Sequence, residues 1–305
     1  NFQKQRAKKI LLEGIKKFDL NLDGLVVFTE AASGNYAYTP ISAAVAGAKK
    51  VYAVTRDSRY GTKEEITENI YRLAREFGVK DKIEVVYEKT KEIISQCDII
   101  TNSGFVRPID KTMIDMMKPT AVVSLMWETW EVRHSEIDLE YCKEKEIVVL
   151  GTHEDTGGLN LYNGVGFLPL KMLFDSGLSV YNDKILVVGN CLTSRCIYNF
   201  LKKCDVDVEK YTFDNKEVLK KLKVFDAIVI AEHSERKNII GLNSEINIDA
   251  ISHDTVICHI TGDMDSKVLK DKKLQFYPEK IADAHYMSMS LDDLDSRAVI
   301  ELMQA

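Results

Sequence analysis

Short apolar runs alternate with stretches of helical periodicity along nearly the whole chain. Continuous apolar runs are typical of strands buried on both faces, and the amphipathic stretches between them are typical of the helices that cover such strands. The pattern predicts strands at residues 25–29, 50–54, 83–87, 98–101, 121–126 and 147–150, and a second series at 185–188, 208–212, 227–231, 255–259 and 274–277. Strands that alternate with helices indicate mainly parallel sheets covered on both faces.

The helical stretches supply the covering elements. They are predicted at residues 4–18, 40–48, 63–77, 162–176, 194–203, 216–222 and 266–269. Pro40 suits the first turn of its helix, because the N–H that proline lacks has no intrahelical partner there in any case. Thr62 and Glu65 have the spacing of a capping box, which predicts that a helix begins directly after Thr62.

The two series of strands predict an α/β protein with two parallel-sheet domains joined by a helix. The length of 305 residues fits two domains, and a hydrophobic content of 45% supplies enough apolar side chains for two cores. We expect one domain over residues 1–160, a linking helix over residues 161–180 and a second domain over residues 181–305.

Charge and composition argue against several classes of partner. The net charge is −6, with Lys and Arg interspersed among Asp and Glu, whereas proteins that bind nucleic acid normally present a basic face. No apolar run approaches the ~20 residues that cross a bilayer, so we expect no membrane contact. The six cysteines form no C-x-x-C pair, which favours free thiols in a cytoplasmic protein.

Sequence patterns of three other chemistries do not occur. No group of His, Cys, Asp and Glu has the spacing of a zinc site, so no metal is expected. The chain also lacks the G-x-S-x-G elbow of the serine hydrolases and the lysine motif of the P-loop proteins. A nucleotide-like cofactor bound to one of the parallel sheets remains the main candidate chemistry.

The passage from the strand at residues 185–188 into the helix at 194–203 is the candidate cofactor site. It has the spacing Gly189-x-Cys191-x-x-Ser194 where a G-x-G-x-x-G fingerprint would stand. A helix N-terminus presents N–H groups and a positive dipole end to an anion. Asp214 lies 25 positions after Gly189, where an acid can accept hydrogen bonds from ribose hydroxyls. The candidate cofactor residues of this passage are Gly189, Asn190, Leu192, Thr193, Ser194 and Asp214.

Polar side chains follow several strands of the first series. Strand ends in an α/β fold deliver side chains to the ligand-binding edge of a sheet, although polar residues are also ordinary in loops. An arginine at such an edge can hold a carboxylate or phosphate with two hydrogen bonds. A small anionic substrate is therefore expected, with the candidate substrate residues Glu30, Asn35, Tyr36, Arg56, Asn102, Ser103, Glu128, Arg133 and Glu154.

The order of elements resembles that of the D-2-hydroxyacid dehydrogenases and, more loosely, the S-adenosylhomocysteine hydrolases. Residues 137–152 are similar to the segment that leads into their linking helix, and residues 257–269 to the strand and turn that carry their substrate-binding arginine. Glu232 and His233 stand where that family contacts the cofactor ribose, and His285 is similar in position to its catalytic histidine. The resemblance implies a flavodoxin-like substrate domain, a linking helix, a Rossmann domain that binds NAD, and a homodimer.

The chain departs from this family at three places, one of which is the absence of a Glu at the spacing that would polarise the catalytic histidine. Thr261 and Gly262 stand where the family has its carboxylate-binding arginine, and both are further candidate cofactor contacts. Two of the three fingerprint glycines are also absent. A plain 2-hydroxyacid is therefore not the expected substrate.

Three functions are compatible with the sequence. The first is an NAD(P)-dependent oxidoreductase in which His285 or His153 exchanges a proton with a small anionic metabolite, and Asp214 favours NAD over NADP. The second is a methyltransferase that uses S-adenosylmethionine, because degenerate glycines impair a pyrophosphate site more than a site for a cofactor without phosphate. The third is a non-catalytic ligand-binding pseudoenzyme, prompted by the missing arginine.

Overall fold

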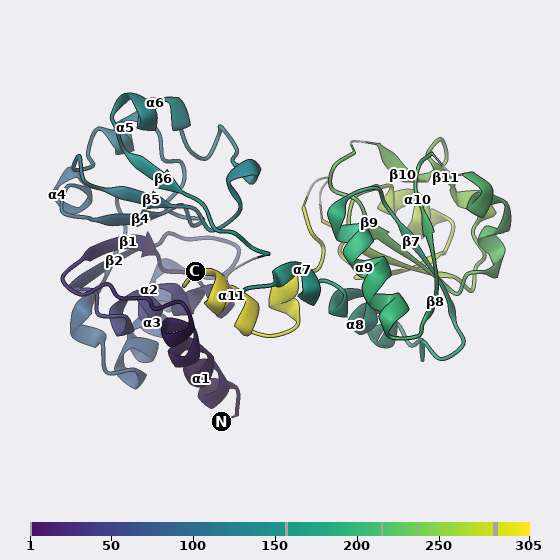
Figure 1. Cartoon of the computed structure of the whole chain (residues 1–305), viewed down its shortest axis with the longest axis horizontal. Coiled ribbons are helices and arrows are strands. Elements are labelled where there is room, and N and C mark those ends of the chain that lie inside the picture. The colour runs from purple at the N-terminus through teal and green to yellow at the C-terminus, as the bar shows by residue number, and fades with distance from the viewer. Residues whose placement is uncertain (1, 156–157, 215, 236, 283–285) are drawn as a thin grey trace. The chain divides into compact units, whose positions relative to one another are not determined.

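The chain folds into two compact α/β units. The computed structural model describes residues 2–155, 158–214, 216–235, 237–282 and 286–305. Unit 1 consists of residues 1–159 together with 296–305, and unit 2 of residues 160–295. Each unit is built around one main sheet, drawn in Figure 1 with the elements labelled.

The sheet of unit 1 has six strands in the order β3-β2-β1-β4-β5-β6. All of its strand pairs are parallel, as the alternation of strands and helices predicts. This is the 3-2-1-4-5-6 order of the doubly wound dinucleotide-binding fold, in which the strand order reverses between β1 and β4. The strands are β1 (Val26–Glu30), β2 (Lys50–Val54), β3 (Ile83–Val86), β4 (Ile99–Thr101), β5 (Val122–Ser124) and β6 (Val148–Leu150).

Helices cover both faces of this sheet, as Figure 1 shows. One face packs on α1 (Phe2–Lys17), α2 (Tyr38–Val45), α3 (Lys63–Glu76) and α11 (Arg297–Leu302), and the other on α4 (Lys91–Ile94), α5 (Lys111–Ile114) and α6 (Leu139–Glu144). The predicted capping box is present at the start of α3, where the Thr62 side chain accepts from the Glu65 N–H and the Glu65 side chain accepts from the Thr62 N–H.

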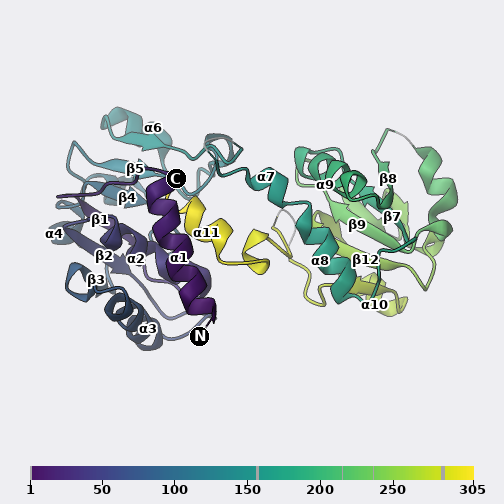
Figure 2. The same ribbon diagram turned by 60° about the horizontal axis from the view of Figure 1, so that its bottom comes forward.

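The last helix returns to the first unit. In Figure 2, α11 lies beside α1. Ile300 on α11 is buried in the same apolar cluster as Ile10 and Leu11 of α1. The Lys17 ammonium contacts the Glu301 carboxylate at 2.6 Å, which adds a polar clamp to this packing. Unit 1 is therefore discontinuous in sequence.

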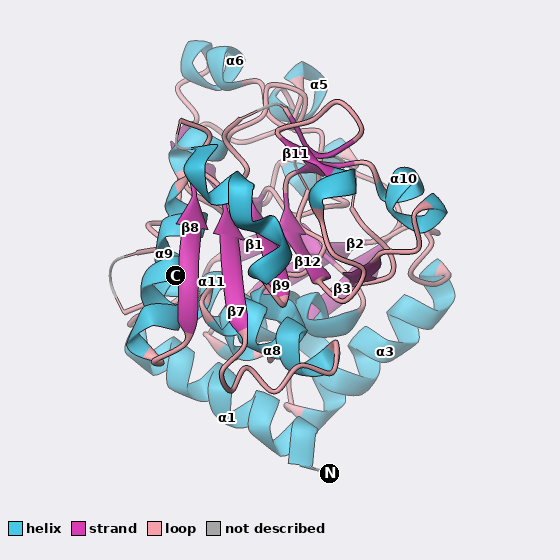
Figure 3. Cartoon of the chain, turned by 90° about the vertical axis from the view of Figure 1, so that its right-hand side faces the viewer, coloured by secondary structure: helices cyan, strands magenta, loops and turns pink. Residues whose placement is uncertain are grey.

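The main sheet of unit 2 has five parallel strands in the order β14-β12-β9-β7-β8, of which Figure 3 shows β8, β7, β9 and β12 side by side. Counted within the unit this is 2-1-3-4-5, the flavodoxin-like order. The resemblance to the dehydrogenases implied a flavodoxin-like domain in the other, N-terminal half of the chain. The strands are β7 (Lys184–Val188), β8 (Asp207–Tyr211), β9 (Ala227–Ala231), β12 (Val256–Thr261) and β14 (Gln275–Tyr277).

Unit 2 also has two covered faces. The segment expected to form the linking helix holds α7 (Leu161–Gly164) and α8 (Phe167–Asp175), both within unit 2. α8 and α9 (Leu192–Lys203) cover one face, and the 3-10 helix at Lys216–Val224 and α10 (Ser266–Asp271) cover the other. A small second sheet joins β10 (Asn238–Gly241), β11 (Ile246–Asn247) and β13 (Asp263–Met264), none of which the apolar pattern predicts.

Two further expectations concern single features. All six cysteines are free thiols, as the absence of paired spacing predicts. Within the described parts of the chain, every helix is too short or too polar to traverse a bilayer.

Candidate functional site

The turn after β7 has the geometry that its glycine predicts. Gly189 has a φ of +148°, a backbone conformation that residues other than glycine rarely adopt. A Cβ at this position would lie 2.5 Å from the Ala231 carbonyl oxygen and 2.9 Å from the Ser194 Cβ. The first glycine of the fingerprint is thus required both by its dihedral angle and by the close approach of β9 and α9.

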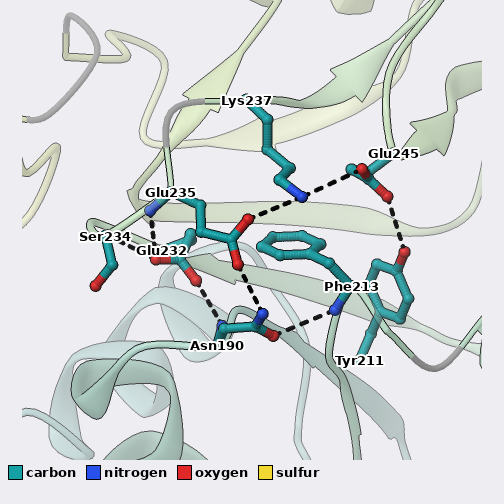
Figure 4. A network of polar contacts seen from close by, with 8 residues as sticks. All are labelled: Asn190, Tyr211, Phe213, Glu232, Ser234, Glu235, Lys237 and Glu245. Atoms are coloured by element: carbon teal, nitrogen blue, oxygen red, sulfur yellow. Dashed lines mark hydrogen bonds and ion pairs between the residues drawn. The ribbon is translucent and has the colours of Figure 1, made fainter.

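Asn190 connects this turn to two neighbouring loops at the carboxyl ends of the strands. Its backbone N–H donates to the Glu232 carboxylate at 2.5 Å, and its side-chain amide donates to Glu235 at 2.8 Å. Its side-chain oxygen accepts from the Phe213 N–H at 3.2 Å. Figure 4 shows Asn190 at the centre of these contacts. The turn is therefore held rigidly against the segments that follow β8 and β9.

Glu232 places a buried carboxylate against this turn. The side chain is 1% exposed, and its carboxylate also accepts from the N–H groups of Ser234 and Glu235 at 2.6 and 3.1 Å. A carboxylate that accepts three backbone N–H bonds is an internal anion in a nest of amides. The sequence identified Glu232 as a candidate contact but gave no sign that it binds the turn of its own chain.

A chain of charged groups continues from this loop. The Lys237 ammonium lies 2.8 Å from Glu235 and 3.4 Å from Glu245, and 4.3 Å from the centre of the Phe213 ring. The Tyr211 hydroxyl donates to Glu245 at 3.2 Å, as drawn in Figure 4. Asp214 is exposed beyond the end of β8 and adds to the negative potential at Glu235 and Tyr211.

The helix that follows the turn begins with an uncapped first turn. Cys191 is the N-cap residue of α9, and its side chain makes no capping hydrogen bond. Leu192, the first helical residue, is 38% exposed, so the helix N-terminus reaches the surface of unit 2. Thr193 and Ser194 are buried; the Thr193 hydroxyl lies 3.3 Å from Nδ1 of His233.

The thiol of Cys191 lies between β9 and α9. Its Sγ is 3.2 Å from the carbonyl oxygen of Ala231. Burial raises the pKa of this thiol, but the neighbouring His233 and the nearby backbone N–H of Ser194, which makes no capping bond by its geometry, outweigh burial, so the pKa lies below its ordinary value. The second glycine of the fingerprint is thus replaced by a side chain that faces inward.

The end of β12 completes this edge of unit 2. The Thr261 carbonyl accepts from the Glu232 N–H at 2.9 Å, which places it beside the Asn190 turn. Gly262 has a φ of +135°, and a Cβ there would lie 3.2 Å from the Glu232 carbonyl oxygen. The residues predicted at positions 189–194, 232–233 and 261–262 therefore form one cluster, which we call the turn site.

A buried histidine stabilises the strand beneath. His259 is fully buried, with Nδ1 2.7 Å from the Ser288 hydroxyl and Nε2 2.8 Å from the Gly262 carbonyl oxygen. Burial lowers its pKa, so the neutral ring is favoured. With both nitrogens engaged, His259 holds the loop after β12 in place.

In unit 1, Glu30 and Asn102 lie where the strand order reverses. The Glu30 carboxylate at the end of β1 accepts from the N–H of Phe105 at 3.1 Å. Burial raises its pKa, and the backbone of Phe105 with the nearby charge of Arg107 partly opposes that shift. Asn102 accepts from the Met126 N–H at 2.8 Å, while its buried Nδ2 has no hydrogen-bond partner among the described residues. The Ser103 hydroxyl is 2.8 Å from that of Thr101.

Arg107 is a site residue that the sequence analysis missed. It lies 2.9 Å from Glu136, stacks 4.2 Å from the centre of the Trp127 ring, and donates to the Asn102 carbonyl oxygen. Arg133, which was predicted, binds the same Glu136 at 3.1 Å. The only available signal was an arginine shortly after a strand end, and such residues are common in loops.

Three predicted residues meet at the ends of β5 and β6. The Glu154 N–H donates to the Glu128 carboxylate at 2.8 Å, and Nδ1 of His153 lies 3.8 Å from the same carboxylate. Burial, followed by the negative charges of Glu131 and Glu128, raises the pKa of Glu154 to about 7. A carboxyl group that titrates near neutrality can both give and take a proton, a property of Glu154 that its sequence context did not predict.

Other predicted residues of unit 1 follow β1 and β2. Asn35 and Tyr36 fall in the 3-10 helix Gly34–Ala37 that follows β1. The Arg56 guanidinium lies 5.3 Å from the centre of the Phe105 ring. His285 lies outside the described residues. Within the described residues, no group of three or more His, Cys, Asp or Glu side chains could hold a metal ion.

Comparison with known proteins identifies the fold. No protein-family model and no curated protein sequence matches the chain. Among solved structures, a dipicolinate synthase chain from Bacillus halodurans aligns with a TM-score of 0.60 over 93% of this chain and 96% of that chain, at 8% sequence identity. The chain shares the fold of that protein. The expected doubly wound α/β fold with two parallel-sheet domains is thereby confirmed, and at this identity the likeness shows the fold alone.

More distant matches carry the names of dehydrogenases. A putative D-3-phosphoglycerate dehydrogenase from Ralstonia solanacearum aligns with a TM-score of 0.42 and 10% identity, over 76% of this chain and 71% of that chain. D-mandelate dehydrogenase from Rhodotorula graminis aligns with a TM-score of 0.41 and 8% identity, over 83% and 91% of the two chains.

Proposed function

We propose that the chain is an oxidoreductase that binds a nicotinamide dinucleotide at the turn site of unit 2 and acts on a small anionic metabolite. The observation that carries the proposal is the strand–turn–helix at Gly189, where no side chain fits and where the uncapped N-terminus of α9 reaches the surface. Helix N-termini of this kind bind phosphate groups through N–H groups and the helix dipole. Asp214, exposed after the neighbouring strand, would favour NAD over NADP.

The turn site fits the cofactor in part. The first-turn N–H groups of α9 are not taken up by a side-chain cap and suit one phosphate. The N–H of Asn190 is already bound to Glu232, so a pyrophosphate would have one donor fewer than in a turn with all three glycines. When bound, the nicotinamide would accept or give a hydride.

Unit 1 contains a carboxyl group that can exchange a proton. Glu154, with a pKa of about 7, is half protonated near neutral pH and has the charge of Glu128 beside it. We propose Glu154, with the neighbouring His153, as a proton donor and acceptor within unit 1, while His285 stays a candidate from the sequence alone. The buried Glu30 and the Arg107 pair with Glu136 would then order the carboxyl edge of the sheet for an anionic substrate.

A methyltransferase reaction with S-adenosylmethionine is the second candidate. One observation favours it: the turn contains the buried carboxylate of Glu232, whose negative charge opposes a pyrophosphate but not a cofactor that has a sulfonium cation and no phosphate. A cofactor of this kind would use the acids of the edge for its ribose.

The cofactor is tested by calorimetric titration and thermal unfolding with NAD, NADP and S-adenosylmethionine. A ligand at about a hundred times its Kd stabilises the folded chain by roughly 2.7 kcal/mol. NAD is expected to bind and S-adenosylmethionine is not; the reverse result would favour the methyltransferase. Binding of none of the three would leave a non-catalytic role.

A matched pair of variants tests the position of the cofactor. Leu192→Asp puts a carboxylate at the first position of α9, where it suits the helix dipole and keeps the fold but repels a phosphate. We expect NAD affinity to fall at least tenfold in Leu192→Asp and much less in the uncharged control Leu192→Asn. Equal effects would place the cofactor elsewhere. The homodimer implied by the family resemblance stays a prediction, to be checked by sedimentation.

A further inference from the structure

Unit 1 contains a cavity of about 150 Å³ that is not lined by any of the candidate cofactor, substrate or catalytic residues. Its walls come from β1, β4 and β5, from α2, and from residues 302–305 at the end of α11 and after it. Thr29 and Thr101 lie on β1 and β4, the two strands between which the strand order reverses. Ligands of doubly wound sheets bind at the carboxyl ends of the strands at this reversal.

The side chains that line the cavity carry no ionisable group. They combine aliphatic and thioether surface, as at Val27 and Met126, with the hydroxyls of threonine and serine and the amide of Gln304. A charged ligand would lose its hydration here without gaining a counter-charge, which is costly. The lining therefore selects a neutral molecule with a predominantly apolar body.

Two hydroxyls of the wall have unused hydrogen-bonding capacity. Thr39 is 6% exposed, and its Oγ1 has no hydrogen-bond partner among the described residues. The Thr101 hydroxyl donates to Thr29 at 2.9 Å, which leaves the Thr29 proton available to another acceptor. A buried polar atom without a partner is unfavourable, so a ligand that supplies one gains affinity.

We propose that this cavity is a binding site for a small neutral molecule with a body the size of a six-membered ring and one hydroxyl or carbonyl group, which bonds to Thr39. The volume sets the size, because an apolar cavity of about 150 Å³ accommodates benzene. The proposal is independent of the cofactor assigned to unit 2, since every lining residue lies in unit 1.

The test uses the full chain with phenol, benzene and benzoate as probes. The methyl groups of methionine are labelled with ¹³C, because Met126 and Met303 line the cavity while Met113 and Met172 are buried elsewhere. Phenol and benzene are expected to shift the signals of Met126 and Met303 and to leave those of Met113 and Met172 in place. Benzoate is expected to shift neither pair.

Thr39→Val separates the hydrogen bond from the cavity. It removes the hydroxyl at nearly constant volume and should weaken phenol roughly two- to tenfold, the range for one net hydrogen bond, without weakening benzene. Thr55→Val is the matched control, because Thr55 also has a buried hydroxyl without a partner among the described residues but does not line the cavity. Phenol should bind to Thr55→Val as it does to the unmodified chain.

Ala43→Leu fills the cavity from α2 and is expected to abolish the shifts by both neutral probes. Thermal unfolding checks that Ala43→Leu is folded. If it is not, Ser124→Leu fills the cavity from β5 instead. The proposal is overturned if saturating phenol leaves Met126 and Met303 unchanged, which would mean that the cavity holds solvent alone. It is also overturned if either folded filling variant keeps the shifts, or if Thr39→Val and Thr55→Val behave alike.

Discussion

Gly189 meets two constraints at once, and they predict a large cost for any side chain. In Gly189→Ala the new Cβ would lie 2.5 Å from a backbone oxygen of β9, which cannot give way without shifting a central strand. We expect a loss of about 2–4 kcal/mol in the free energy of unfolding of unit 2.

Gly177→Ala is the control for the dihedral angle alone. Gly177 has a φ of +95° but open space around its Cβ position. Gly177→Ala should lower the free energy of unfolding by only ~1 kcal/mol, with both glycine variants measured by urea titration. Equal losses in the two variants would show that the contact with β9 does not matter.

Glu154 makes the stability of unit 1 dependent on pH. Its pKa is about 7 in the folded chain against an ordinary value of 4.5, so between these two values the folded state binds more protons than the unfolded state. Stability from this group is therefore greatest at low pH and falls as pH rises through that window.

Glu154→Gln should cancel this fall. We expect the variant to gain roughly 1 kcal/mol over the unmodified chain at pH 8, after allowance for solvent screening, and nothing at pH 4. Thermal unfolding at the two pH values measures the difference. Glu140→Gln, in the half-exposed helix α6 away from this cluster, is the control.

Local chemistry explains which single residues were predictable. The positive φ of Gly189 and the Thr62–Glu65 capping box depend on a few neighbouring positions of the chain, so their spacing suffices. The bond from Asn190 to Glu232 joins residues 42 positions apart and depends on how β7 and β9 are paired. Arg107 likewise acquires its role only from Trp127 and Glu136, which other loops supply.

At the scale of elements, α11 is expected to be essential to unit 1. Ile300 is 1% exposed within the cluster that α1 and α2 form on the sheet. Ile300→Ala should destabilise unit 1 by about 2–4 kcal/mol, because it leaves a cavity. The two tryptophans, Trp127 and Trp130, both belong to unit 1, so their fluorescence reports its unfolding.

The comparison for Ile300→Ala is the equally buried Ile257 of unit 2. Ile257→Ala should leave the tryptophan transition in place and move only the circular-dichroism transition of unit 2. A tryptophan transition that responded to both substitutions alike would mean that the two units unfold together.

Strands and helices were predicted where one pattern dominates. β2 and β9 begin and end where expected, because a buried parallel strand is a continuous apolar run. β11 and β13 have two residues each, too short for any periodicity. The return of α11 to unit 1 was not predictable either, since its apolar face fits the core of either unit equally well in sequence.

At the scale of the whole molecule, the chain passes between the units twice, near residue 160 and near residue 295. A single proteolytic cut at either passage should therefore leave the two units joined through the other passage, whereas cuts at both release residues 160–295. Limited proteolysis followed by gel filtration and denaturing electrophoresis distinguishes these cases. The fold alone does not identify the reaction, because doubly wound sheets serve many different reactions. Only the side chains at the edges of the sheets distinguish one reaction from another.

The discontinuity of unit 1 also sets an order of events during synthesis. Domains form as units while the chain leaves the ribosome from its N-terminus. Residues 160–295 are complete before α11 emerges, so the later unit can reach its native state first. Until α11 emerges, the apolar surface of α1 and α2 that receives Ile300 stays uncovered. The incomplete first unit is therefore expected to bind chaperones during synthesis.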